Sequence, residues 1–216
     1  MRIFFSQVWL NAKVNQAGID WSEFFVFQIG VSVLTLTFYV LIASFTTGEV
    51  DLTRWVVGNA FVLCTLECVH TVGVSFNGER FNGRLRMIIV SPTSKLTVLL
   101  YTGSWAVFSS FVIVTISFLI GGLLFGVELA NINWAAFWIS ILVTAFSCMG
   151  LGLLMGIFAL ISDSMYLILN AVAMLIMIFS GANFPVEQFP LPAQWLGFIF
   201  PVARGITAAN NYINRI

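Results

Sequence analysis

The chain has 216 residues, of which 60% are hydrophobic, 8% are charged and the formal net charge is zero. A soluble domain of ordinary composition carries roughly 25% charged residues, and a soluble fold cannot bury so much apolar surface because too little polar surface remains to face water. The composition therefore excludes a soluble globular domain and predicts an integral membrane protein, and the zero net charge gives no bulk attraction to nucleic acid.

The first segment, residues 1–22, is too polar to be a membrane span. It mixes aromatic residues such as Trp9 with Arg2, Lys13 and several amides. This mixture is typical of an amphipathic helix lying in the membrane interface, and its aromatic content favours that structure over a disordered tail. We expect a cytoplasmic interface helix here, followed by a transmembrane domain over residues 23–216.

Five apolar stretches follow, and each approaches the 20 or so residues that a transmembrane helix needs. A different kind of segment comes after them, since residues 180–216 are apolar but interrupted by prolines. The predicted spans are Phe24–Phe45, Trp55–Phe76, Leu96–Phe125, Trp134–Ile161 and Met165–Phe179.

Basic residues are unevenly distributed around these spans. The loop 77–95 holds four of them and the N-terminal segment holds Arg2 and Lys13, whereas the turns after the first and third spans hold only Arg54. Lys and Arg accumulate in cytoplasmic loops. The sequence therefore predicts a cytoplasmic N-terminus, a cytoplasmic loop 77–95 and an outer start for the proline-bearing segment.

The loop 77–95 carries a helical pattern of its own. Leu85, Ile88 and Ile89 recur at helical spacing, and Ser91-Pro92 ends the pattern because the residue before a proline avoids the helical region. A short amphipathic helix at this place could lie against a partner and pass motion into the membrane. A solvated, positively charged loop explains the pattern equally well.

The same loop resembles the signature of the ABC-2 family of ABC-transporter permeases, which reads Glu-Arg-Glu-x-Gly-Thr-x-Glu-x-Leu and then Ser-Pro and a basic residue. Phe81, Arg84 and Arg86 depart from that pattern, which bears on the salt bridges that this copy makes. The matching positions are Glu79, Arg80, Gly83, Leu85, Ile88, Ser91, Pro92 and Lys95. In the family this segment is the coupling helix that docks on the ATPase, so the resemblance implies a coupling role for Glu79, Arg80, Gly83, Arg84, Leu85 and Ile88.

The tail is similar to a second family pattern, Ser-Gly-x-x-Phe-Pro-x-Glu-x-Leu-Pro. A stretch that begins at Pro201 follows it, with Arg204 where the family has a tyrosine or a similar residue. The resemblance implies a re-entrant helical hairpin over residues 180–204, near the outer leaflet. Broken backbone at membrane depth is tolerated only where protein or a cavity shields it. The residues that match this pattern are Gly181, Phe184, Pro185, Glu187 and Pro190.

The resemblance also implies an architecture and a set of partners. The fold would be an all-α, ABC-2 (type V exporter-like) transmembrane domain with five visible spans and an outer hairpin. The family has a sixth span, which Ala208–Ile216 is too short to form at 1.5 Å per residue, so we expect the sequence to be cut short. The expected partners are ABC ATPase subunits, which bind ATP and Mg²⁺, and a second permease copy or paralogue in a homo- or heterodimer surrounded by lipid.

The expected function is that of a transport subunit in the bacterial plasma (inner) membrane, which exports an amphipathic drug, lipid, lipopeptide or glycan. The chain would not itself be an enzyme, because no P-loop lysine follows a glycine-rich turn and no catalytic triad is evident. Gly150, Gly152 and Gly156 have no strand before them. The Gly152-x-x-x-Gly156 spacing is instead typical of close helix packing.

Glu67 stands in the middle of the second predicted span, with His70 three residues later on the same face. Ionisable residues inside a span are functional candidates by default. One hypothesis is a polar contact in a substrate path, or a proton-linked switch in a carrier or an intramembrane enzyme. The other, which we favour, is a neutral or hydrogen-bonded Glu67–His70 pair packed between helices. The nearby Cys64 and Cys68 do not predict a metal site, because zinc ligands of this kind usually lie in polar loops with closer pairing.

Overall fold

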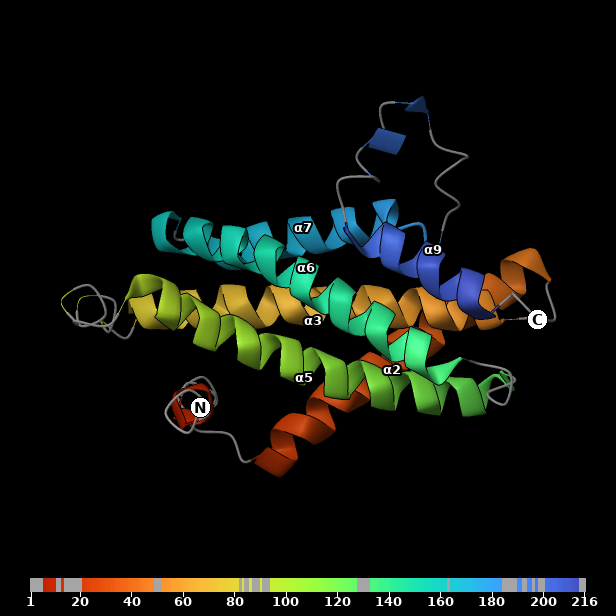
Figure 1. Ribbon diagram of the computed structural model, residues 1–216. Coiled ribbons are helices and arrows are strands. Elements are labelled where there is room, and N and C mark those ends of the chain that lie inside the picture. The colour runs from red at the N-terminus through yellow and green to blue at the C-terminus, as the bar shows by residue number, and fades with distance from the viewer. Residues whose placement is uncertain are drawn as a thin grey trace.

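Apolar stretches separated by short polar turns fold into an antiparallel helical bundle in the computed structural model (Figure 1). The structure describes residues 6–10, 13, 21–48, 52–81, 83, 86, 90, 94–127, 133–162, 164–183, 190–191, 194–195, 197 and 201–213. Its main helices are α2 (Trp21–Thr47), α3 (Thr53–Phe81), α5 (Lys95–Leu124), α6 (Trp134–Ile161), α7 (Met165–Phe179) and α9 (Pro201–Ile213).

Four of these helices, α2, α3, α5 and α6, are long and apolar enough to cross a membrane. The chain is therefore a multi-pass membrane protein. The predicted fifth span is present as α7 with the expected bounds, but its 15 residues rise only about 22 Å, which is short of the roughly 30 Å hydrocarbon layer. The all-α membrane fold is as predicted, with four long helices and, in the place of the fifth predicted span, one shorter apolar helix.

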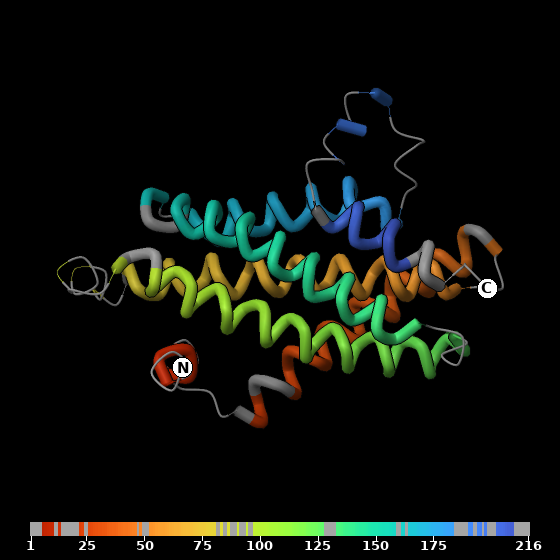
Figure 2. Tube along the Cα trace, viewed as in Figure 1, coloured from red at the N-terminus to blue at the C-terminus, as the bar shows by residue number. Residues whose placement is uncertain are grey.

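The bundle has two ends (Figure 2). At one end, which we call the Arg80 end, α3 and α6 finish and α5 and α7 begin. We call the opposite end the Trp134 end. Polar side chains satisfy free backbone groups where two helices begin. The N–H of Thr97 donates to Ser94 Oγ over 3.2 Å at the start of α5, and the N–H of Ala136 donates to Asn133 Oδ1 over 3.3 Å at the start of α6.

α3 is the centre of the bundle, because it packs against α2, α5, α6, α7 and α9. Buried residues make up 78% of its most apolar stretch, compared with 22% for α2, 50% for α5 and 39% for α6. α3 is also the least hydropathic of the four long helices. Polar side chains are costly in hydrocarbon, so the helix that carries the most of them is placed where protein surrounds it.

Glycines allow α3 to approach its neighbours closely near the Arg80 end. A Cβ atom added at Gly152 would lie 3.0 Å from the Cβ of Val72, and one added at Gly156 would lie 2.5 Å from the ring of Phe76. Gly73 of α3 lies against Met165 and Leu169 of α7 in the same way. The predicted packing role of the Gly152-x-x-x-Gly156 spacing is confirmed, and its partner is α3.

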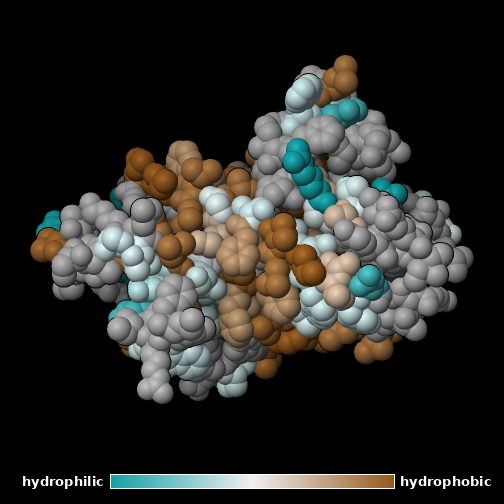
Figure 3. Space-filling view, viewed as in Figure 1, coloured by the Kyte–Doolittle hydropathy of each residue, from teal (hydrophilic) through white to brown (hydrophobic). Residues whose placement is uncertain are grey.

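α2 is attached by a narrow stripe of residues. Ser32, Leu36, Val40 and Ala43 are buried at helical spacing, and the rest of this long helix is largely exposed and apolar. Apolar side chains also cover the middle of the bundle on the face shown in Figure 3. Lipid is the solvent that suits such a surface.

We predict that Gly156→Ala destabilises the protein and that Gly150→Ala does not. The added methyl group at position 156 meets three atoms of the Phe76 ring, whereas nothing lies within 4 Å of a Cβ at position 150. Overpacking of this kind costs about 1–3 kcal/mol, while glycine to alanine in an open helical position is favourable by up to about 1 kcal/mol. Thermal unfolding of the purified variants in detergent measures both effects, and equal melting temperatures for the two variants would contradict this packing.

Candidate functional site

The carboxyl group of Glu67 lies between α2 and α3 and has two hydrogen-bond partners. Gln28 Nε2 of α2 donates to one of its oxygens, and Thr71 Oγ1, one turn further along α3, donates to the other over 3.1 Å. Glu67 is buried. The Gln28 bond therefore joins the most exposed long helix to the most buried one in the middle of the bundle.

His70 is not among the partners that the structure gives to Glu67. The hypothesis of a Glu67–His70 pair is therefore corrected, because the carboxylate is satisfied by the neutral donors Gln28 and Thr71. Residues three apart share a helix face, but this spacing does not decide whether a side chain bonds along its own helix or across to a neighbour.

The three cysteines, Cys64, Cys68 and Cys148, are free and buried. The thiol of Cys148 donates to Thr65 Oγ1 over 3.3 Å, and the thiol of Cys68 donates to the carbonyl of Ala145 over 3.6 Å. These contacts join α3 to α6. Among the described residues no group of three or more His, Cys, Asp or Glu side chains is placed to hold a metal ion.

The Arg80 end holds the described part of the predicted coupling segment. Glu79 and Arg80 lie in the last turn of α3, and Arg80 Nη1 donates to the main-chain carbonyl of Ser162 over 2.9 Å. Ser162 is the residue directly after α6. The remaining residues of the predicted coupling set, Arg84, Leu85 and Ile88, lie outside the described residues.

Gly83 turns the chain after α3. Its N–H donates to the carbonyl of Arg80 over 3.2 Å, and its φ of +69° lies in the left-handed region that glycine adopts without strain. This geometry gives a physical reason for a glycine four residues after Glu79, independent of any resemblance.

Asn77 lies one turn before Arg80 on α3 and is buried. Its side-chain oxygen has no hydrogen-bond partner among the described residues. A buried acceptor without a partner costs about 1–3 kcal/mol. The Arg80 end therefore combines a satisfied charged contact with an unsatisfied polar one.

At the Trp134 end the chain leaves α7 and folds back onto α3. Gly181 has a φ of +77°, which ends the helical path after Phe179. Asn59 Nδ2 then donates to Asn183 Oδ1 over 3.1 Å, and Gly58 leaves room for Ala182 directly beside it. The start of the predicted re-entrant segment is thus held by the half of α3 that lies toward the Trp134 end.

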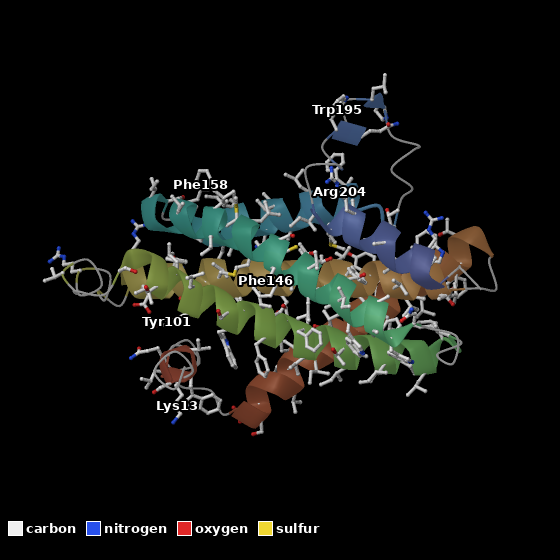
Figure 4. The ribbon with its side chains drawn as sticks, viewed as in Figure 1. Lys13, Tyr101, Phe146, Phe158, Trp195 and Arg204 are labelled. Atoms are coloured by element: carbon white, nitrogen blue, oxygen red, sulfur yellow. The ribbon has the colours of Figure 1, made fainter. Side chains whose placement is uncertain are left out.

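The rest of that segment is described in part. Phe184, Pro185 and Glu187 lie outside the described residues, and Pro190 is exposed. α9 packs its buried face, Val202, Ile206 and Ala209, against α3 and α6 and turns Arg204 away from them, so that Arg204 lies exposed (Figure 4).

Several functional contacts involve residues that the sequence does not single out, namely Gln28, Ser162 and Asn183. Gln28 and Asn183 are amides in apolar surroundings, which is a signal that a polar partner exists without indicating where it lies. Ser162 acts through its main-chain carbonyl. No side-chain pattern can reveal such a contact.

Helices long enough to span the membrane, a polar central helix and connections that pack back onto it define a multi-pass helical membrane protein. Residues 56–215 match the family model described as ABC-2 family transporter protein, and the chain therefore belongs to this family. Members of the family are membrane transport subunits without an ATP site of their own, and they associate with ABC ATPases. No curated protein and no solved structure matches the chain.

We predict a measurable coupling between Gln28 and Glu67 in a double-mutant cycle. With Gln28→Leu, Glu67→Leu and the double variant, unfolding in mixed detergent micelles is expected to give an interaction free energy of about 0.6–1.7 kcal/mol, the range of hydrogen bonds inside membrane proteins. The matched control is the cycle of Glu67→Leu with His70→Leu, for which we expect about 0.5 kcal/mol or less. The reverse order of the two values would restore the Glu67–His70 pair.

Proposed function

We propose that this chain is the permease subunit of an ATP-driven exporter, which moves an amphipathic drug, lipid, lipopeptide or glycan outward. The observation that carries the proposal is the position of the Glu79-Arg80 pair. This pair matches the family's coupling pattern and lies in the last turn of α3, which is the helix that contacts all the other main helices. A displacement of the end of α3 is therefore passed directly to the helices that surround it.

α3 and its contacts are stiff enough to carry a displacement along the bundle. α3 is a continuous helix from Thr53 to Phe81, and its Arg80 half meets α6 and α7 through glycines. Packed interiors are close to crystal density and transmit displacement rather than absorb it. An ATPase that moves the segment 77–95 would therefore displace α3, α6 and α7 together, and the shift would reach the Asn59–Asn183 contact at the other end.

The proposed orientation puts the Arg80 end in the cytoplasm of a bacterial cell, at the inner membrane. Basic residues support it, because Lys13 lies toward the same end of the bundle as Tyr101 of α5 (Figure 4), and the described residues Arg80, Arg86 and Lys95 are at or next to that end. Residues 1–22 would then lie along the cytoplasmic membrane surface, and the part of this segment that is described before α2, residues 6–10 and 13, is helical.

The proposed complex contains two ATPase subunits, which bind ATP and Mg²⁺, and a second permease copy or paralogue. The long apolar face of α2, which includes Phe27, Phe38 and Phe45, supports contact with lipid or with such a partner. The segment 180–204 would form the outer hairpin, and its anchoring to α3 at Asn183 supports this role, because irregular backbone at membrane depth needs protein around it.

The test uses the chain reconstituted in vesicles together with its proposed ABC ATPase partner. We predict that Glu79→Ala combined with Arg80→Ala lowers substrate-stimulated ATP hydrolysis and transport by about tenfold or more, as expected when charged contacts of about 1.5 kcal/mol or more are lost. Glu67→Gln, which keeps a side chain that can bond to Gln28, should leave transport within about threefold, because a single hydrogen bond inside a membrane protein contributes about 0.6 kcal/mol on average.

The opposite pattern would contradict the proposal. If the Glu79 and Arg80 variant is fully coupled while Glu67→Gln abolishes transport, the chain is better described as a proton-linked carrier or an intramembrane enzyme built on Glu67 and His70. The absence of any partner ATPase would argue against the exporter in the same way.

A further inference from the structure

The contact between Arg80 and Ser162 joins two parts of the chain that are 82 residues apart. The donor is the guanidinium at the end of α3 and the acceptor is the carbonyl of the residue that ends α6, at 2.9 Å. The last carbonyls of a helix have no partner within the helix, and a cation at this place is also favoured by the helix dipole. Arg80 therefore caps α6 with a charge-assisted hydrogen bond.

Ser162 is part of a short turn that binds α6 to α7. Its N–H donates to the carbonyl of Phe158 over 2.9 Å, and its hydroxyl accepts from the N–H of Ser164 over 3.2 Å. The carbonyl of Ser164 in turn accepts from the N–H groups of Leu167 and Ile168, at the start of α7. A displacement of Ser162 therefore moves the ends of both helices.

The helices behind this contact leave little room for sliding. Phe76 lies against Gly156 of α6, and Gly73 lies against Met165 of α7, at distances where an added methyl group would overlap its neighbours. Asn77, between these contacts and Arg80, keeps a buried oxygen without a partner among the described residues. This unsatisfied acceptor makes the present arrangement of the Arg80 end less stable than one in which Asn77 is bonded.

We infer that Arg80 is a positioning residue that ties the end of α3 to the α6–α7 turn, and that it transmits motion rather than docking on the ATPase. The part of this inference that concerns transport rests on the proposed function. The segment that follows Gly83 is the part that contacts the ATPase in this scheme. Arg80 passes the displacement of α3 directly to Ser162, so that α6 and α7 move in step with α3.

The variants Arg80→Gln and Arg80→Met test this role in the complex with its ATPase. Methionine keeps an apolar side chain that packs as the aliphatic part of arginine does. Arg80→Met therefore replaces Arg80→Gln in the test if the glutamine variant does not fold. Arg80→Lys keeps a charged donor and is the rescue variant. Arg54→Gln is the matched control, because Arg54 is an exposed basic residue at the opposite end of the same helix.

We expect ATPase binding to the Arg80→Gln permease to stay within about twofold of wild type, while transport per ATP hydrolysed falls about tenfold, the effect of losing a charge-assisted bond. Arg80→Lys should recover most of the ratio of transport to ATP hydrolysis, and Arg54→Gln should not change it. Loss of ATPase binding in Arg80→Gln and Arg80→Met would overturn the inference in favour of direct docking. An unchanged transport ratio in either variant would overturn it as well.

A second readout does not depend on the ATPase. Spin labels on cysteines introduced at Arg86 and Ser164, both exposed, report the distance between the loop and the α6–α7 turn, and the three native cysteines are buried and can stay in place. Arg80→Met should broaden this distance distribution. An unchanged distribution would show that Arg80 does not hold the end of α3 to the α6–α7 turn, which would overturn the inference. If wild type binds no ATPase at all, the proposed function fails, while the spin-label result still decides whether the tie exists.

Discussion

A polar side chain inside a membrane must find its partner in the protein, and this constraint organises the whole bundle. α3 carries Asn59, Thr65, Glu67, Thr71 and Asn77, and it is the helix that the others surround. Its hydroxyl groups are satisfied locally, as when Thr65 donates to the carbonyl of Phe61 over 3.0 Å. Asn59 and Glu67 bond to other segments, and these contacts help to place α2 and the segment after α7.

In the proposed function, the central position of α3 also provides the route for motion. One end of the helix leads into the segment that resembles a coupling helix, and the other end holds the beginning of the proline-bearing segment through Asn59. Between these two ends, glycines on α3 and α6 bring the helices into direct contact, with no flexible side chain between them that could absorb a displacement. A transport subunit without an ATP site needs such a path, since the energy enters from a partner at one membrane face.

Helix bounds could be predicted well from the sequence, because hydropathy and chain length are local properties. The predicted spans Trp134–Ile161 and Met165–Phe179 coincide with α6 and α7. Contacts between helices were less accessible. Spacing along one helix suggested His70 as the partner of Glu67, whereas Gln28 from another helix is bonded to it. The acceptor of Arg80 is a backbone carbonyl, which has no residue signature, and the family resemblance pointed to a partner protein instead.

The most direct test of the account is the lipid exposure of α3. A photoactivated carbene reagent dissolved in the lipid of a nanodisc labels side chains that face hydrocarbon, and mass spectrometry locates the adducts. We predict almost no labelling between Val56 and Val72 of α3, because most residues of this stretch are buried within the single chain. This expectation holds whether lipid or a partner chain covers α2. The exposed faces of α5, α6 and α7 should be labelled. Dense labelling along α3 would contradict its central position, and with it the route for motion that depends on it.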